Sequence, residues 1–97
     1  MLNKRNNKYK ISLQEIELKE GTSSGKTVEF EFENHDNILS LIEMTKDSDR
    51  FENKAENVEF IVGLKLFSEV LLRNRYNPLF EDFAPAFKEF INKLKGK

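Results

Sequence analysis

Two stretches near the start of the chain alternate apolar and polar residues, as in a β-strand with one buried face. In "TVEFEFE" three apolar side chains alternate with three glutamates: Val28, Phe30 and Phe32 with Glu29, Glu31 and Glu33. The earlier stretch, "YKISLQEIEL", changes phase between Leu13 and Ile16, and one extra residue near Gln14 would restore the phase as a β-bulge. We therefore expect a two-stranded antiparallel hairpin with a bulge in its first strand.

The segment that joins these stretches, "EGTSSGKTVEF", has the look of a phosphate-binding loop. Such a loop needs four residues between its glycines and a helix after it, because helix N-terminal amides complete the phosphate cradle. Here three residues separate Gly21 from Gly25, and Lys26-Thr27 leads straight into a strand. The pattern predicts a hairpin connection rather than a nucleotide site.

Helical spacing of apolar residues begins after this hairpin. "ENHDNILSLIEMTKD" predicts a first helix with Asp36 as its N-cap, or alternatively Asn34. A longer helix is predicted over about Lys54–Asn74, with Gly63 inside its apolar arc. Because glycine inside a helix costs about 1 kcal/mol relative to alanine, we expect another backbone to pack closely against Gly63.

The final segment, "NPLFEDFAPAFKEFINKLKGK", predicts the last helical region. Asn77-Pro78 suits an N-cap followed by a first helical residue, and Pro85 should divide the segment into a short turn and a helix over about Ala84–Lys95. The predicted fold class is therefore α+β in the order β-β-α-α-α, with three helices packed on one face of the hairpin. We expect a single domain over residues 1–97, with a flexible basic N-terminal arm at residues 1–7.

Composition excludes several chemistries. The chain has 97 residues, no cysteine and a net charge of only −1, although 34% of its residues are charged. These values argue against disulfides, thiol nucleophiles and a nucleic-acid partner. No apolar run approaches the length of a membrane span, and the basic start is not followed by the apolar stretch of a signal peptide. We expect a cytoplasmic protein with no membrane partner and no cofactor.

The single histidine lies in "NHD", at the junction between the second strand and the first helix. The residues Asn34, His35 and Asp36 are a candidate ligand site, because histidine titrates near neutrality and carboxylates lie nearby. The alternative is a structural junction held by local hydrogen bonds. A metal site is not expected, since the chain has no second histidine and no cysteine to complete a ligand set.

A row of glutamates is predicted on the polar face of the hairpin. Glu29, Glu31 and Glu33 share that face, and Glu15 and Glu17 join it if the bulge is present. Like charges on paired strands repel each other, although Lys8 and Lys10 can offset the end near Glu31 and Glu33. The row is either a solvated face or an acidic docking face for a basic partner.

Several of these segments together resemble a small bacterial family of roughly hundred-residue proteins that is catalogued only as a domain of unknown function. The most specific part is the string Gly63-Leu64-Lys65-Leu66-Phe67 with Glu69-Val70; the others are Tyr9-Lys10-Ile11, Asn34-His35-Asp36, Asn74-Arg75, Pro78-Leu79-Phe80 and Leu94-Lys95. Members often have a second aspartate after "NHD", where this chain has Asn37. The resemblance implies a bacterial, cytoplasmic, single-domain protein and gives no activity or ligand.

The sequence favours a non-catalytic protein-interaction module that self-associates. A two-stranded sheet leaves both edges open, and several apolar residues lie off the main helical stripes, so we expect a homodimer and allow for an unidentified protein partner. The alternative is a small-ligand-binding or catalytic protein with its site around His35. The enzyme hypothesis is weak because no serine is marked by a nucleophile motif.

Overall fold

The two alternating stretches form an antiparallel hairpin in this computed structural model, which describes residues 6–96. Strand β1 (Asn7–Gln14) pairs with β2 (Thr27–Asn34) in a continuous register. The opposed apolar pairs on one face are Tyr9 with Phe32, Ile11 with Phe30 and Leu13 with Val28. The α+β class and the hairpin are thus confirmed.

Charged side chains on the other face pair across the two strands. Lys8 approaches Glu31 at 3.5 Å and Lys10 approaches Glu29 at 3.4 Å, and all four side chains are more than half exposed. Each lysine therefore reaches the glutamate next to the one directly opposite it in the register. Pairs this exposed contribute little to stability, but they offset the like charges of the row.

The predicted bulge is not formed, because β1 ends at Gln14. The Glu15 N–H donates to the carbonyl of Lys26, and the chain then leaves the ladder and forms a loop over residues 16–26. Ile16 is 85% exposed. Ile16 therefore lies outside β1, although it continues the apolar alternation of the sequence. Gly21 and Gly25 have φ angles of 92° and 74° in this loop, a region that favours glycine.

Four helices follow the hairpin, whereas three were predicted. They are α1 (Ile38–Thr45), α2 (Glu56–Arg73), α3 (Pro78–Glu81) and α4 (Ala84–Lys95). The extra helix is the short turn before Pro85, where the Asn77 side chain accepts a hydrogen bond from the Leu79 N–H and caps α3. The bounds of α4 match the prediction.

The N-cap of α1 is Asn37, and neither Asp36 nor Asn34 has this role. The Asn37 side chain accepts a hydrogen bond of 3.1 Å from the Ser40 N–H. Both predicted residues make contacts elsewhere, as described below. An aspartate side chain can accept the same hydrogen bond, so the aspartate that members of the resembling family often have at this position would cap the helix equally well.

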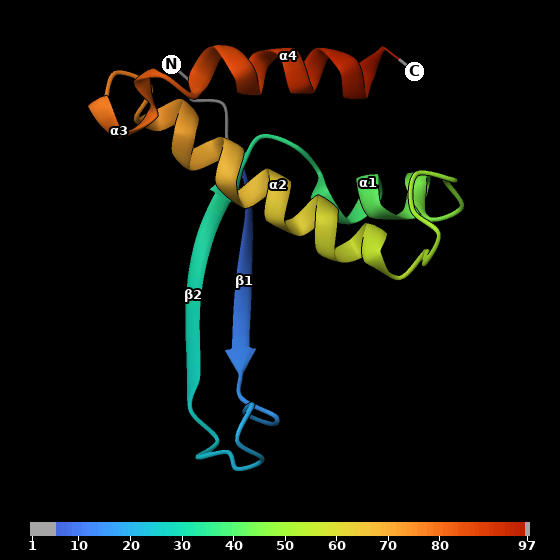
Figure 1. Cartoon of the computed structure of the whole chain (residues 1–97), viewed down its shortest axis with the longest axis vertical. Coiled ribbons are helices and arrows are strands. Elements are labelled where there is room, and N and C mark those ends of the chain that lie inside the picture. Colours follow the sequence, from blue (N-terminus) through green and yellow to red (C-terminus); the bar gives the residue numbers. More distant parts are fainter. Residues whose placement is uncertain (1–5, 97) are drawn as a thin grey trace.

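The helices do not cover one face of the hairpin, which corrects the predicted packing. The hairpin extends away from the helical body, and only its base lies against α2 (Figure 1). Leu13, Val28 and Phe30 on its apolar face are 69%, 58% and 43% exposed. The chain consequently has two parts, a helical body and a projecting two-stranded hairpin.

Aromatic contacts join α2 to α3, α4 and the segment before α2. The centroid of the Phe67 ring of α2 lies about 6 Å from the centroids of three other rings. These are Phe80 of α3, Phe83 at the N-cap of α4 and Phe87 of α4. Phe60 contacts Phe51 and Phe90 in the same edge-on manner. Among the described residues, the buried apolar side chains are Ile38, Ile61 and Leu71. This is a small core for the length of the chain.

Gly63 is exposed, and apart from its chain neighbours and the backbone of its own helical turns no described atom lies within 4 Å of the position that a Cβ would take there. The expected close packing of another described backbone is therefore wrong. The buried face of α2 contains Asn57, Ile61 and Leu71, so the face that packs is displaced from the arc in which Gly63 was placed.

Most of the predicted N-terminal arm, residues 1–7, precedes the part of the chain that the structure describes. Residues 1–5 lie outside the described residues. Asn7, the last residue of the predicted arm, belongs to β1 and pairs with Asn34. Among the described residues, no helix is long and apolar enough to cross a membrane.

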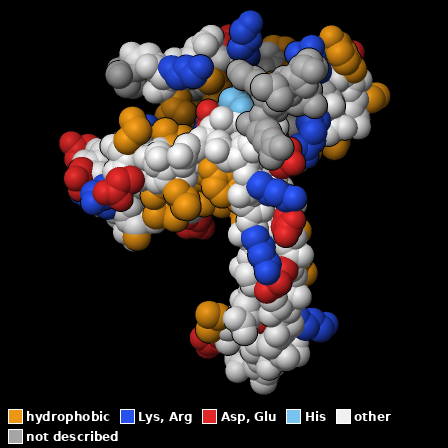
Figure 2. Space-filling view, turned by 180° about the vertical axis from the view of Figure 1, so that it is seen from behind, with side chains coloured by type: hydrophobic (Ala, Val, Ile, Leu, Met, Phe, Trp, Pro, Cys, Tyr) orange, Lys and Arg blue, Asp and Glu red, His pale blue; other side chains and the backbone are white. Residues whose placement is uncertain are grey.

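The radius of gyration and the accessible surface of the chain are both larger than expected for a compact domain of its length. Its radius of gyration is 16.3 Å, against about 12.5 Å expected for a folded domain of 97 residues. Its accessible surface is 8349 Å², against about 5,800 Å² expected for a folded monomer of 11.4 kDa. The accessible surface thus exceeds the expected value by about 2,500 Å². Figure 2 shows that part of the outside of the helical body is apolar.

Candidate functional site

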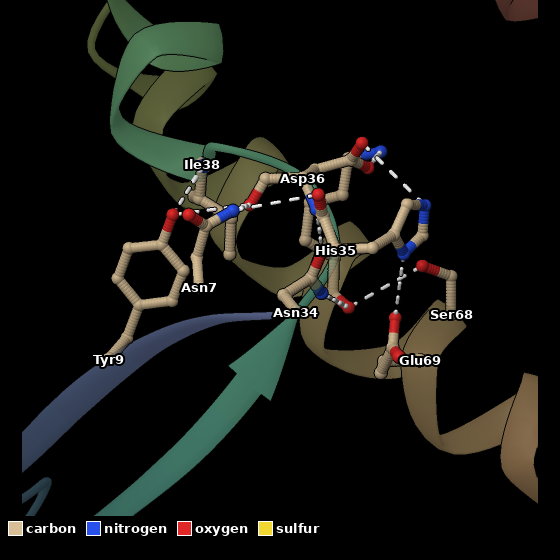
Figure 3. A network of polar contacts seen from close by, with 9 residues as sticks. Asn7, Tyr9, Asn34, His35, Asp36, Ile38, Ser68 and Glu69 are labelled. Carbon is tan, nitrogen blue, oxygen red and sulfur yellow. Dashed lines mark hydrogen bonds and ion pairs between the residues drawn. The ribbon is translucent and has the colours of Figure 1, made fainter. Parts of the chain in front are cut away.

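The residues Asn34, His35 and Asp36 join the end of β2 to the start of α1 and lie against α2 (Figure 3). Asn34 is fully buried. Its Nδ2 donates to the Lys65 carbonyl at 3.1 Å, and its Oδ1 accepts from the Asp36 N–H at 2.9 Å. A buried amide needs partners of both kinds, and here each is supplied by a different segment. Asn34 therefore fixes the hairpin to α2.

Asp36 forms the strongest charged contact of the junction. Its Oδ2 lies 2.7 Å from Lys65 Nζ, and both side chains are mostly shielded from solvent. The hydrogen bond from Lys65 lowers the pKa of Asp36 below its ordinary value of 3.8, against the opposing effect of burial; the charges of Lys65, His35 and Lys95 lower it further. The carboxylate of Asp36 is thus engaged in an ion pair that ties the junction to α2.

His35 lies at the surface of the junction, with 64% of its side chain exposed. Its Nδ1 is 3.4 Å from Glu69 Oε1, and its Nε2 is 3.6 Å from Asp36 Oδ1. The two carboxylates approach opposite nitrogens of the ring (Figure 3), so they do not converge on one point as metal ligands must. Among residues 6–96, no group of three or more histidine, cysteine, aspartate or glutamate side chains could hold a metal ion.

The first strand also contributes to the junction. Asn7 Nδ2 and the Tyr9 hydroxyl donate to the Asp36 carbonyl at 3.0 and 3.2 Å. The same hydroxyl accepts from the Ile38 N–H at 2.9 Å, at the start of α1. The base of β1, the turn and α1 are thereby joined through one tyrosine oxygen.

Sequence reasoning did not place four of these residues at the junction: Asn7, Tyr9, Lys65 and Glu69. Lys65 and Glu69 are charged residues of α2, and their side chains are only 22% and 15% exposed. Their separation of four residues placed them on one helical face, which was the available signal. Their partner could not be identified, because Asp36 is 29 residues away from Lys65.

A shallow cleft of about 280 Å³ adjoins the junction. Asp36 and Lys65 line one part of it, and the remaining lining residues come from the start and exposed side of α1: Asn37, Ser40, Leu41 and Met44. Asp36 and Lys65 already satisfy each other at this cleft. The charged groups are therefore arranged to hold the chain together.

The predicted acidic face is divided in the structure. Glu29 and Glu31 are paired with lysines, and Glu33 lies on the same strand. Glu15 lies beyond the last strand pair, where its Oε1 accepts hydrogen bonds from the Ser24 N–H and from the hydroxyls of Ser23 and Ser24. Glu17 is an exposed residue of the loop. Glu15 and Glu17 thus do not extend the strand row.

The fold and the junction define a small α+β protein with a projecting hairpin locked to a helical body. The chain belongs to a family described as a domain of unknown function with a solved structure, DUF3861, whose model matches residues 7–96. It is similar to the crystal structure of a protein of unknown function from Pectobacterium atrosepticum, with 34% identity and a TM-score of 0.83. The similarity covers 95% of this chain and 99% of that chain. None of the curated proteins matches the chain.

Proposed function

We propose that this chain is a non-catalytic protein-interaction module that acts as a homodimer. The excess surface carries the proposal: about 2,500 Å² more is exposed than folded monomers of this mass expose. A stable protein–protein interface of standard size buries about 800 Å² on each partner. The exposed surface is thus sufficient for an extensive contact.

The chemistry of that surface supports the same conclusion. Large apolar side chains are exposed on every part of the chain, including Leu13, Ile16, Val28, Leu39, Met44, Val58, Leu72 and Leu79. Single exposed apolar residues are common in monomers, but few monomers expose them together with so small a core. An isolated two-stranded hairpin is also only marginally stable in water. A second copy that covers the hairpin would supply the missing packing.

A small-ligand or catalytic site around His35 receives less support. Both ring nitrogens face carboxylates of the same chain, and Asp36 is committed to Lys65. These contacts are the ones that a structural junction requires. We assign Asn34 and Asp36 the role of holding the hairpin in its direction, and we place His35 at the exposed edge of the same junction.

The setting proposed for this module is the bacterial cytoplasm. The similar crystal structure comes from Pectobacterium atrosepticum. The chain has no cysteine, and 34% of its residues are charged. A further protein partner would bind to the assembled dimer.

Sedimentation equilibrium of the untagged protein from nanomolar to high micromolar concentration tests the homodimer. We expect a mass of twice 11.4 kDa at the upper concentrations, with dissociation on dilution. A mass of one chain at every concentration would refute self-association. Scattering data on the dilute and concentrated samples would show whether the projecting hairpin is present in both.

A further inference from the structure

The loop at the free end of the hairpin, residues 15–26, which we call the hairpin tip, presents apolar side chains to solvent. Ile16 is 85% exposed and Leu18 is 39% exposed. The loop is nevertheless ordered by its own hydrogen bonds, including those from Gly21 N–H to the Leu18 carbonyl and from Ser24 N–H to Glu15. An ordered loop loses little conformational entropy when it binds, so the hairpin tip is suited to docking.

The helical body has an apolar groove of about 240 Å³ between α1, α2 and α4. Its apolar lining consists of Leu41 from α1, Ile61 and Leu64 from α2, and Ile91 and Leu94 from α4. Arg50 and Lys95 also line the groove, together with Lys65, which is paired with Asp36. The groove is thus apolar inside and basic at its edge, and its volume accommodates a branched aliphatic side chain.

The hairpin tip of the same chain is remote from this groove. The hairpin extends away from the helices, and the tip lies at its far end (Figure 1). We infer that the hairpin tip of one copy occupies the groove of a second copy, with Ile16 and Leu18 against the apolar lining. This inference rests on the proposed homodimer, whose contact surfaces it identifies.

Charge complementarity supports this arrangement. Glu17 and Glu20 are exposed acids of the hairpin tip, whose net charge is −1 because Glu15, Glu17 and Glu20 outnumber Lys19 and Lys26. Arg50 and Lys95 lie at the groove. A tip seated in the groove brings the two acids toward the two bases. Such rim pairs favour the correct orientation and faster association more than they add affinity.

A two-fold axis makes the contact reciprocal. Each copy then donates one hairpin tip and receives another, which is the self-complementary arrangement of a closed dimer. The two hairpins run side by side in opposite directions between the two bodies. Their exposed apolar faces, which include Leu13, Val28 and Phe30, are then available to pack against the partner and add to the buried area.

An intermolecular relaxation experiment identifies the surface that the tip contacts. Lys19 is exposed in the tip, and the native chain has no cysteine, so Lys19→Cys gives a single attachment point for a nitroxide label. Labelled chains at natural isotope abundance are mixed with unlabelled chains enriched in ¹⁵N. We expect the strongest signal loss at the amides of Leu41 and Leu94 in the enriched chains, and no loss after the label is reduced.

The outcomes separate the two proposals. Signal loss centred on another surface, with the mass still that of two chains, would overturn the tip-in-groove contact and leave the homodimer intact. A mass of one chain under the same conditions would overturn both. Oxidised label attached at Glu43→Cys, on α1 between the groove residues Leu41 and Thr45, is the reciprocal test and should broaden the tip amides of the partner, whereas unchanged tip amides would overturn the contact.

A pair of substitutions tests the apolar contact itself. Ile16→Asp introduces a charge into the proposed interface, while Thr22→Asp adds the same charge to the same loop at another exposed residue. We expect Ile16→Asp to raise the dimer dissociation constant at least about tenfold, and Thr22→Asp less than about threefold. An unchanged dissociation constant for Ile16→Asp would overturn the inference. Both sites are exposed within one chain, so neither change should unfold it.

Discussion

Replacing Asn34 with alanine tests whether the junction holds the hairpin to the helical body. Asn34 is fully buried and makes two hydrogen bonds, to the Lys65 carbonyl and from the Asp36 N–H. Alanine leaves the Asp36 N–H without this acceptor, and an unsatisfied buried donor costs about 1–3 kcal/mol. The Lys65 carbonyl loses a second donor, which adds about 0.5–1.5 kcal/mol. We expect the free energy of unfolding to fall by about 1.5–4.5 kcal/mol, a large part of the 5–15 kcal/mol that is typical of a small domain.

The assay is urea unfolding followed by circular dichroism, at one fixed protein concentration because self-association contributes to the measured stability. Asn92→Ala is the matched control, since Asn92 is an exposed residue of α4. The control should change the free energy of unfolding by less than about 0.5 kcal/mol. If Asn34→Ala is as stable as the control, the two hydrogen bonds do not hold the junction and the reasoning is wrong.

Asn34→Asp provides a second, independent test. An ionised carboxylate can still accept from the Asp36 N–H, but it cannot donate to the Lys65 carbonyl. Burial raises the pKa of an aspartate, so the new side chain becomes protonated and regains a donor as the pH falls. The loss of stability relative to wild type should therefore be smaller at pH 4 than at pH 7. An equal loss at both values would contradict this explanation.

Three further perturbations are predicted from other parts of the structure. The pKa of Asp36 is lower in the folded chain than in the unfolded chain, where it is about 4, so the ionised carboxylate stabilises the fold above that pH. This contribution is lost as the pH falls through the pKa of the folded state. Asp36→Asn should therefore weaken the pH dependence of stability in acid. Gly63→Ala should raise the free energy of unfolding by about 1 kcal/mol in dilute protein, because Gly63 is exposed and no described atom lies near its missing Cβ; a decrease would show that something packs there. His35→Ala should change the free energy of unfolding by less than about 0.5 kcal/mol because the ring is mostly exposed. Metal analysis of the untagged wild type should find no stoichiometric transition metal, and one tightly bound zinc per chain would contradict the structural role.

Local patterns were sufficient for both strands, for three of the four helices and for the order of these elements. Val28, Phe30 and Phe32 determined both the second strand and its apolar face, and Asn77-Pro78 marked the start of α3. These signals succeed because they depend on neighbouring residues: the two-residue period of a strand, and a capping side chain within a few residues of its donor.

Predictions failed where the deciding contact is far away in the sequence or where a local pattern is shared by different structures. Ile16 continues an apolar alternation, but it lies in an exposed loop, and alternation alone cannot distinguish a strand from a loop. Aspartate is a residue type that favours the N-cap position. The carboxylate of Asp36 nevertheless pairs with Lys65, and Asn37 caps the helix. The burial of Asn34 depends on α2, which the sequence pattern around Asn34 does not reveal.

The junction also determines how accurately the hairpin is aimed. Each strand has eight residues and spans about 26 Å, so a rotation of 10° at the base would move the far end by about 5 Å. The hairpin behaves as a lever whose pivot is the network around Asn34, Asp36 and Tyr9. A buried asparagine is well suited to a pivot, because its donor and acceptor permit few orientations, whereas an apolar residue of similar size would tolerate many. Angular precision is thus a consequence of the same contacts that attach the hairpin.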